Sequence, residues 1–125
     1  MNDKAKKTVL IVEDNDKNMK LARDILEAKG YAVLAAVNGE DGVALATAEL
    51  PDLILMDIQM PGIDGVEAFA RLRAEPRTAA IPVAAFTASV TAGDRSRVTQ
   101  AGFTAFVGKP INLKEFVATV ARLTA

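Results

Sequence analysis

Three carboxylates, a hydroxyl and an ammonium group stand where short apolar runs of this sequence end. Glu13 and Asp14 follow the first run, Asp57 follows the third, Thr87 the fourth and Lys109 the fifth. Two like charges about 4 Å apart repel by roughly 4 kcal/mol at an effective dielectric constant of 20. Three gathered carboxylates therefore favour a bound cation, and Mg²⁺ prefers one or two carboxylates with waters and phosphate oxygens.

The other two groups suit a phosphate. Lys109 is a point charge for a phosphoryl oxygen, Thr87 can donate a hydrogen bond to another, and the small Ala88 leaves room beside them. The Asp57 carboxylate could attack phosphorus in line and form an aspartyl phosphate, with Mg²⁺ and Lys109 neutralising the equatorial oxygens. The residue types thus indicate phosphoryl acceptance at Asp57.

Each of these residues also has an ordinary structural interpretation. Asp14 precedes Asn15 as in a turn or helix cap, and Asp57 precedes a Met-Pro-Gly turn. Thr87 alone is typical of a loop hydroxyl, and Lys109 alone is typical of a solvated loop charge. The prediction of a phosphoryl acceptor site depends on all of these residues lying at strand ends of one alternating strand–helix pattern.

In this pattern, short apolar runs alternate with amphipathic stretches. The predicted strands are Thr8–Val12, Tyr31–Val37, Leu53–Met56 ending in Asp57, Ile81–Phe86 and Ala105–Val107. The predicted helices are Asp16–Lys29, a helix capped by Asn38 and running to Glu49, Gly65–Ala74, a helix opened by a capping box at Thr91–Asp94 and ending before Gly102, and a helix capped by Asn112. Five strand–helix units predict a doubly wound α/β fold, in which ligands bind beyond the carboxyl ends of the strands.

Helical periodicity also predicts which side chains are buried. Three helices are expected to bury Val43, Ala46 and Leu50; Val66, Phe69 and Ala70; and Leu113, Phe116, Val117, Val120 and Ala121. Phe86 is expected in the core as well. The arginines are interpreted as solvated helix faces: Arg71, Arg73, Arg77, Arg95 and Arg97.

Composition excludes several classes of function. The 125 residues carry 15 Lys and Arg against 16 Asp and Glu, with no Cys and no His. Disulfides, zinc–thiolate sites and histidine bases are therefore absent, and no basic field favours nucleic acid. The first apolar run is too short for a signal peptide or a membrane span. We expect one cytoplasmic domain over residues 1–125, with residues 1–7 as a flexible tail and with no nucleic-acid or membrane partner.

Four segments resemble the receiver domain of two-component response regulators, over nearly the whole chain. They are Val9-Leu-Ile-Val-Glu-Asp-Asn15, Asp52-Leu-Ile-Leu-Met-Asp-Ile-Gln-Met-Pro-Gly62, Ile81-Pro-Val-Ala-Ala-Phe-Thr-Ala88 and Gly108-Lys-Pro110. The resemblance implies a five-stranded parallel sheet in the order 2-1-3-4-5 with five helices. The stretch from Glu13 to Leu21 is most similar to the stand-alone cell-division regulators of the DivK type.

The resemblance implies a role for each site residue. Asp57 would accept the phosphoryl group. Asp14 would bind Mg²⁺ directly, Glu13 largely through water, and Gln59 through its backbone carbonyl. Thr87 and Lys109 would sense the phosphoryl group, and the Lys109–Pro110 peptide bond is expected to be cis.

The resemblance also implies partners and an output. A histidine kinase or a histidine phosphotransfer protein would donate from phosphohistidine, and a downstream protein would respond. The fourth helix, fifth strand and fifth helix would form the signalling face, in a monomer or a weak homodimer. The switch aromatic, often Tyr in this family, is Phe106 here. We expect Phe106 still to move inward on phosphorylation, through apolar burial alone.

Three competing functions stay open. A phosphatase of the haloacid dehalogenase type also uses an aspartyl nucleophile but needs an acid two residues later, where this chain has Gln59. The same fold could serve as a phosphate-independent interaction module, and the chain could be a receiver domain that belongs to a hybrid kinase. A nucleotide-binding protein is disfavoured because the glycines form no phosphate-binding motif.

Overall fold

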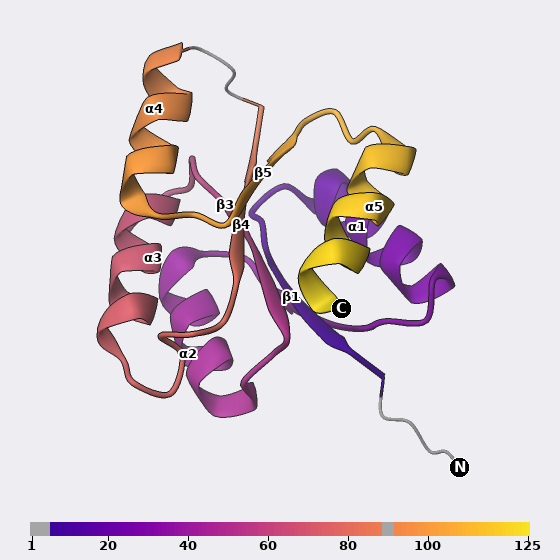
Figure 1. Ribbon diagram of the computed structural model, residues 1–125, viewed down its shortest axis with the longest axis horizontal. Coiled ribbons are helices and arrows are strands. Elements are labelled where there is room, and N and C mark those ends of the chain that lie inside the picture. Colours follow the sequence, from indigo (N-terminus) through magenta and orange to yellow (C-terminus); the bar gives the residue numbers. More distant parts are fainter. Residues whose placement is uncertain (1–5, 89–91) are drawn as a thin grey trace.

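The fold is an open parallel sheet between two layers of helices (Figure 1). The computed structural model describes residues 6–88 and 92–125, without the side chains of residues 92–94. The strands are β1 (Thr8–Val12), β2 (Ala32–Ala36), β3 (Leu53–Asp57), β4 (Val83–Thr87) and β5 (Ala105–Gly108). They are all parallel and lie in the order β2-β1-β3-β4-β5, which confirms the predicted topology.

The helices divide between the two faces of the sheet as a doubly wound fold requires. They are α1 (Asp16–Ala28), α2 (Gly39–Glu49), α3 (Gly65–Ala74), α4 (Ala92–Ala101) and α5 (Leu113–Thr124). Helices α1 and α5 cover one face, and α2, α3 and α4 cover the other (Figure 1). None of the described helices is long and apolar enough to cross a membrane.

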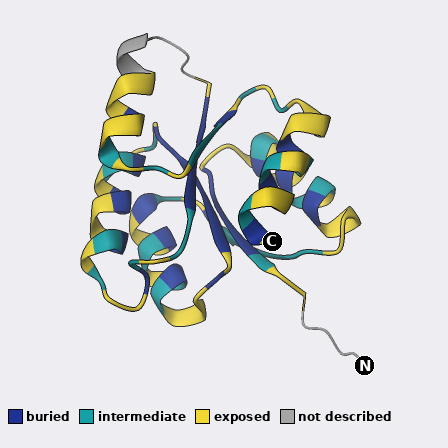
Figure 2. Cartoon of the chain, in the orientation of Figure 1, coloured by how far each residue is buried: buried dark blue, intermediate teal, exposed yellow. Residues whose placement is uncertain are grey.

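The central strands are buried on both faces because helices cover both. All residues of β3 and β4 are buried, as are four of the five in β1 (Figure 2). The outer strands β2 and β5 are only partly buried. This burial explains why the central strands read as continuous apolar runs rather than alternating ones.

Side-chain caps begin four of the helices. The side chains of Asn15, Asn38, Asp64 and Asn112 accept a hydrogen bond from the backbone N–H three residues on. The predicted caps at Asn38 and Asn112 are therefore confirmed. The capping box expected from Thr91 begins outside the described residues, and the tail expected over residues 1–7 falls mostly on residues 1–5, which are also outside them.

Some predicted details are wrong at the ends of elements. Strand β4 begins at Val83 rather than Ile81, because Pro82 has no N–H to donate to a neighbouring strand. Leu50 ends α2 in the left-handed region with a φ of 51° and is 45% exposed rather than buried. In α3, Phe69 is buried as predicted, but Ala70 is exposed, and Ala68 and Leu72 are buried instead. In α5, Leu113 and Ala121 were predicted to be buried and are exposed.

Three of the five arginines that were predicted to be solvated contact residues outside their own helix, and a fourth, Arg71, pairs with Glu67 within α3. Arg97 forms an ion pair with Asp64, and Arg95 lies over the ring of Phe106 with its guanidinium carbon 4.4 Å from the ring centroid. Arg73 lies over Phe69 and donates to the carbonyl of Ile81. Helical periodicity missed the contacts with Asp64, Phe106 and Ile81 because these partners lie outside the helix that carries each arginine, whereas Arg73 and Phe69 are neighbours on α3.

Candidate functional site

The sheet register brings the polar strand ends to one edge. Asp57 at the end of β3 pairs with Phe86 of β4, and Thr87 pairs with Gly108 at the end of β5. Glu13 follows β1, which lies on the other side of β3. Strands far apart in the sequence thus place their last residues around Asp57.

Three carboxylates gather at this edge. One carboxylate oxygen from each of Glu13, Asp14 and Asp57 lies within 4.8 Å of the other two. Glu13 and Asp57 are almost fully buried, with 1% and 4% of their surface exposed, whereas Asp14 is exposed. The cluster therefore combines two desolvated carboxylates with one that is open to solvent.

Lys109 reaches into the cluster from the β5–α5 loop. Its ammonium group pairs with Glu13 Oε1 and lies 3.4 Å from Asp57 Oδ2. The same Nζ lies 4.7 Å from the centroid of the Phe86 ring. The lysine side chain is only 11% exposed, so its charge offsets part of the carboxylate repulsion in a site that is largely shielded from solvent. The Lys109–Pro110 peptide bond is cis, as expected.

Burial changes the acidity of Asp57. Desolvation raises the pKa of its carboxyl group to about 7, against an ordinary value of 3.8. The ammonium of Lys109 opposes this rise, and the neighbouring Glu13 adds to it. Below about pH 7 the metal-free site therefore holds a proton that an incoming cation would have to displace.

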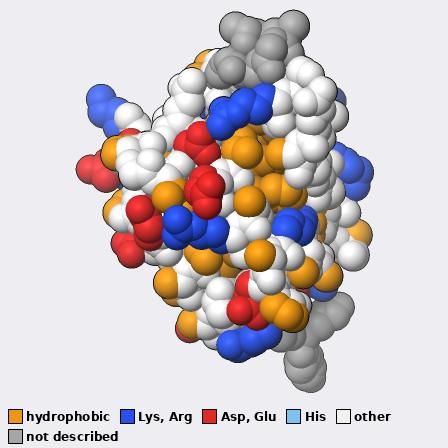
Figure 3. Space-filling view, turned by 90° about the vertical axis from the view of Figure 1, so that its left-hand side faces the viewer, with side chains coloured by type: hydrophobic (Ala, Val, Ile, Leu, Met, Phe, Trp, Pro, Cys, Tyr) orange, Lys and Arg blue, Asp and Glu red, His pale blue; other side chains and the backbone are white. Residues whose placement is uncertain are grey.

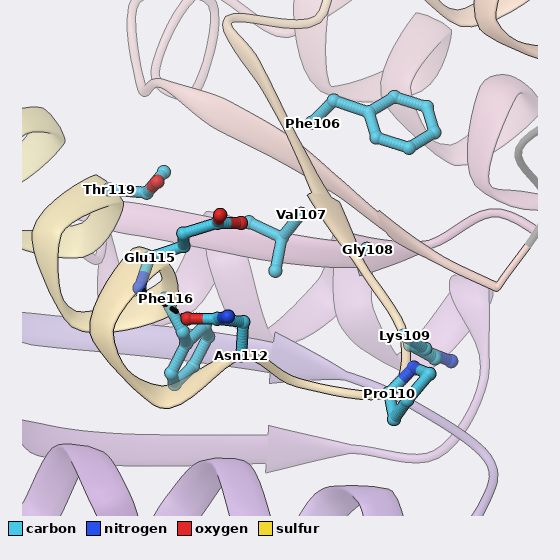
Figure 4. Close-up of a pocket in the computed structure, with 9 residues that line it drawn as sticks. All are labelled: Phe106, Val107, Gly108, Lys109, Pro110, Asn112, Glu115, Phe116 and Thr119. Atoms are coloured by element: carbon cyan, nitrogen blue, oxygen red, sulfur yellow. Dashed lines mark hydrogen bonds between the residues drawn. The ribbon is translucent and has the colours of Figure 1, made fainter.

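The structure shows where the remaining predicted residues lie. Thr87 is buried at the end of β4, and the backbone N–H of Gln59 donates a 3.1 Å hydrogen bond to Asp57 Oδ1. A pocket lies between β5 and α5 (Figure 4). Phe106 is half-buried on β5, and its side chain points away from this pocket. The ammonium group of Lys109 also points away from it. Phe106 packs instead with Ile58 and Val98 on the α4 side.

The donor set fits a hard divalent cation. Glu13 Oε1 is buried and has no regular hydrogen-bond partner among the described residues, although Lys109 lies against it. Carboxylate oxygens with unused lone pairs and a solvent-exposed Asp14 are suitable ligands for Mg²⁺, which keeps several waters when bound. The residues present therefore fit a magnesium ion.

Gly65 contributes to the site in a way that sequence reasoning missed. A Cβ at this position would lie 2.3 Å from the backbone oxygen of Asp57 and 2.8 Å from Ile58 Cα. Only glycine allows α3 to begin directly against the strand that carries Asp57. The signal in the sequence was a glycine at the first position of a predicted helix, which has no obvious local purpose there.

Comparison with known proteins agrees with this geometry. The family described as "Response regulator receiver domain" matches residues 9–121. The polar-differentiation response regulator DivK of Brucella anthropi is 45% identical over 114 residues, covering 91% of this chain and 93% of that protein. The DivK of Brucella ovis is 44% identical over the same length and shares. The chain therefore belongs to the response regulator receiver family.

Solved structures show the same fold. A response regulator from Chloroflexus aurantiacus superposes with a TM-score of 0.91 at 30% identity, covering 96% of this chain and 98% of that one. The receiver domain of a sensor histidine kinase from Pseudomonas aeruginosa gives a TM-score of 0.89 at 32% identity with the same coverage, and it was solved with magnesium in its active-site cleft. The fold is thus that of chemotaxis-type receivers, one of which matches with a TM-score of 0.89.

Family membership defines the class of function. The chain is a receiver-type phospho-acceptor with an acidic cluster typical of the magnesium site of receivers, and it is not a turnover enzyme. A receiver domain implies a histidine kinase or a phosphotransfer protein as its partner. The two DivK proteins share 45% and 44% of aligned residues with it.

Proposed function

We propose that this protein is a signalling switch that accepts a phosphoryl group on Asp57 from a phosphohistidine donor and then changes its partner-binding face. The observation that supports the proposal most strongly is the position of Asp57. Its carboxylate is buried at the carboxyl edge of the sheet, with Glu13, Asp14 and the Lys109 ammonium around it. This is the charge pattern that in-line phosphoryl transfer requires.

We propose that four groups hold Mg²⁺ at this site. Asp14 and Asp57 would bind through carboxylate oxygens, Glu13 through water, and Gln59 through its backbone carbonyl. The bound ion would supply positive charge for the phosphoryl oxygens. The exposed Asp14 lies nearest to solvent, so it marks the side from which a hydrated ion and a donor protein can approach.

The chain's own residues carry out the transfer. A carboxylate oxygen of Asp57 forms a bond to phosphorus while the bond from phosphorus to the donor's imidazole nitrogen breaks, and the ring, protonated on its other nitrogen, leaves with the electron pair as neutral imidazole. The Lys109 ammonium, 3.4 Å from Asp57 Oδ2, exchanges part of its carboxylate contact for a phosphoryl oxygen. The Thr87 hydroxyl donates to another phosphoryl oxygen at the end of β4.

The output follows from the position of Thr87 between the site and β5. When Thr87 turns toward the phosphoryl group, Phe106 can move inward over it, and the surface of α4, β5 and α5 changes. A downstream protein, or a second copy in a weak homodimer, would bind this surface. Kinases that make phosphohistidine use ATP, which is found in the cytoplasm. We therefore propose that the protein acts in the cytoplasm.

Labelling with a small acyl phosphate tests the chemistry. We expect the purified chain to gain one phosphoryl group in the presence of Mg²⁺ and none with a chelator, and Asp57→Asn to gain none. Labelling without Mg²⁺, or of the Asp57→Asn variant, would contradict the proposal. Continuous turnover of phosphomonoesters would instead favour a phosphatase of the haloacid dehalogenase type, and a complete lack of labelling would favour a phosphate-independent module.

Similarity to the DivK proteins supports a narrower proposal, that the switch serves polar differentiation or cell division. The identity to DivK is higher than the 32% to a receiver domain of a sensor kinase. Phosphotransfer profiling against the kinases of the source organism tests this, with Asp57→Asn as control. Preferred transfer from a kinase fused to this same sequence would favour a receiver domain of a hybrid kinase.

A further inference from the structure

An ion pair on the surface joins α4 to the loop that follows the acceptor. Arg97 Nη2 lies 2.7 Å from Asp64 Oδ2, with the two side chains 51% and 38% exposed. Two other surface pairs between described residues lie within single helices, Lys20–Asp24 in α1 and Arg71–Glu67 in α3. Figure 3 looks onto the face that carries α3 and α4, where acidic and basic side chains lie beside an apolar strip.

Asp64 holds one end of a short closed loop. The loop runs from Ile58 to Asp64, and the N–H of Gly65 donates a 3.0 Å hydrogen bond back to the carbonyl of Ile58. Gly65 lies so close to Asp57 that a Cβ there would meet its backbone oxygen at 2.3 Å. Asp64 is therefore joined through Gly65 to the backbone beside the acceptor.

Helix α4 also contacts the other end of this loop. Val98 of α4 is buried in an apolar cluster with Ile58 and Ala85. Arg97 and Val98 are adjacent in the sequence, so one turn of α4 reaches both Asp64 and Ile58. Gln59 lies between these two contacts, with its N–H bonded to Asp57 Oδ1.

We propose that Arg97 and Asp64 are positioning residues for the metal site. By fixing Asp64, Arg97 keeps the Ile58–Asp64 loop in the shape that presents the carbonyl of Gln59 to Mg²⁺. Because coupling between two sites is reciprocal, Mg²⁺ binding stabilises the docked position of α4. This inference rests on the proposed metal site, and it links that site to α4 without a phosphoryl group.

The decisive variant is Arg97→Gln, because electrostatics and positioning predict opposite results. Removal of a positive charge near the acidic cluster would by itself strengthen Mg²⁺ binding. Loss of the ion pair with Asp64 instead weakens Mg²⁺ binding. The expected loss of affinity is about 1.5- to 5-fold, if this pair contributes as much free energy as exposed ion pairs usually do. Isothermal titration calorimetry with Mg²⁺ alone measures the change, and unchanged or tighter binding would overturn the inference.

Three controls separate positioning from a general loss of stability. Arg97→Lys keeps the charge and should restore most of the affinity. Arg71→Gln removes a pair of similar exposure, 48% and 54%, within α3, and should leave Mg²⁺ affinity unchanged. Asp64→Asn retains a good cap for the N–H of Glu67, and in that background Arg97→Gln should have no further effect. Equal weakening by Arg71→Gln would contradict a specific role for Arg97.

Hydrogen exchange supplies a readout that does not depend on activity. In the wild-type chain, Mg²⁺ should slow amide exchange in α4, and this protection should disappear in Arg97→Gln. If the wild type binds no Mg²⁺, the proposed metal site itself fails. If it binds Mg²⁺ without protecting α4, only the positioning role of Arg97 fails.

Discussion

The protonation of Asp57 in the metal-free protein makes stability depend on pH in an unusual direction. Burial raises the pKa of this carboxyl group to about 7 in the folded chain, against 3.8 as its ordinary value. The folded chain therefore binds the proton more tightly than the unfolded chain does. Between about pH 4 and pH 7 the folded state holds more protons, so its free energy of unfolding decreases as the pH rises.

The size of the effect follows from the two pKa values. Between about pH 5 and pH 8 the contribution of Asp57 falls by about 3 kcal/mol, which corresponds to roughly 10 °C in melting temperature for a domain of this length. The Asp57→Asn variant keeps the shape of the side chain but cannot ionise, so it should lack this dependence. Near pH 8 the variant should be the more stable protein.

Urea unfolding with a chelator present, for both proteins across this pH range, measures the difference. The other titrating groups are common to both proteins, so the difference between the two curves reports Asp57. Addition of Mg²⁺ should restore stability to the wild type near pH 8 and have little effect on the variant. Two parallel pH profiles would refute the assignment of a raised pKa to Asp57.

Three variants and one spectroscopic measurement test individual residues. Asp14→Ala should weaken Mg²⁺ binding yet raise the metal-free stability by less than about 1 kcal/mol, because Asp14 is exposed and its repulsion is screened; a lower melting temperature would count against a crowded acidic site. Lys109→Met should destabilise the metal-free chain near pH 8 by about 3–5 kcal/mol in urea unfolding, since it leaves Glu13 and Asp57 buried without their cation, and a loss under about 1 kcal/mol would contradict the pairing. Gly65→Ala should lower both stability and acyl-phosphate labelling because the added Cβ meets the backbone of Asp57, and normal labelling would show that the close approach is not required. Fluorine NMR of a labelled Phe106 should report a changed environment on phosphorylation, and an unmoved ring would exclude it as the switch residue.

The topology could be predicted well from the sequence because burial and chemistry coincide at the strands. The runs that form β1, β3 and β4 are apolar throughout, as required by helices on both faces, and a polar residue marks the end of each. Since the carboxyl ends of parallel strands meet at one edge, Glu13, Asp57 and Lys109 are expected together on sequence grounds alone, and the structure places them so.

The contacts between helices could not be predicted in the same way. Periodicity assigns a face to each helix, but it does not say which neighbouring element that face meets. Arg97 looked solvated because its partner Asp64 is 33 residues away in the sequence. Leu50 looked buried because periodicity cannot foresee that the helix ends there in a left-handed turn.

Burial differences within the cluster also lay beyond the sequence. Glu13 and Asp14 are adjacent acidic residues at the end of one strand, yet only Glu13 is buried. The N–H of Glu13 still bonds to the carbonyl of Ala36 in β2, so the chain stays extended one residue beyond β1, and successive side chains of an extended chain point to opposite sides. Spacing alone does not identify that bond.

Mapping the phosphorylated residue tests the central claim most directly. After acyl-phosphate labelling with Mg²⁺, borohydride reduction converts a phosphoaspartate into homoserine, which peptide mass spectrometry locates in the sequence. We predict conversion at Asp57 alone, dependent on Mg²⁺ and lost in Asp57→Asn. Conversion at Asp14 or at another carboxylate, with Asp57 intact, would contradict the assignment of Asp57 as the phosphoryl acceptor.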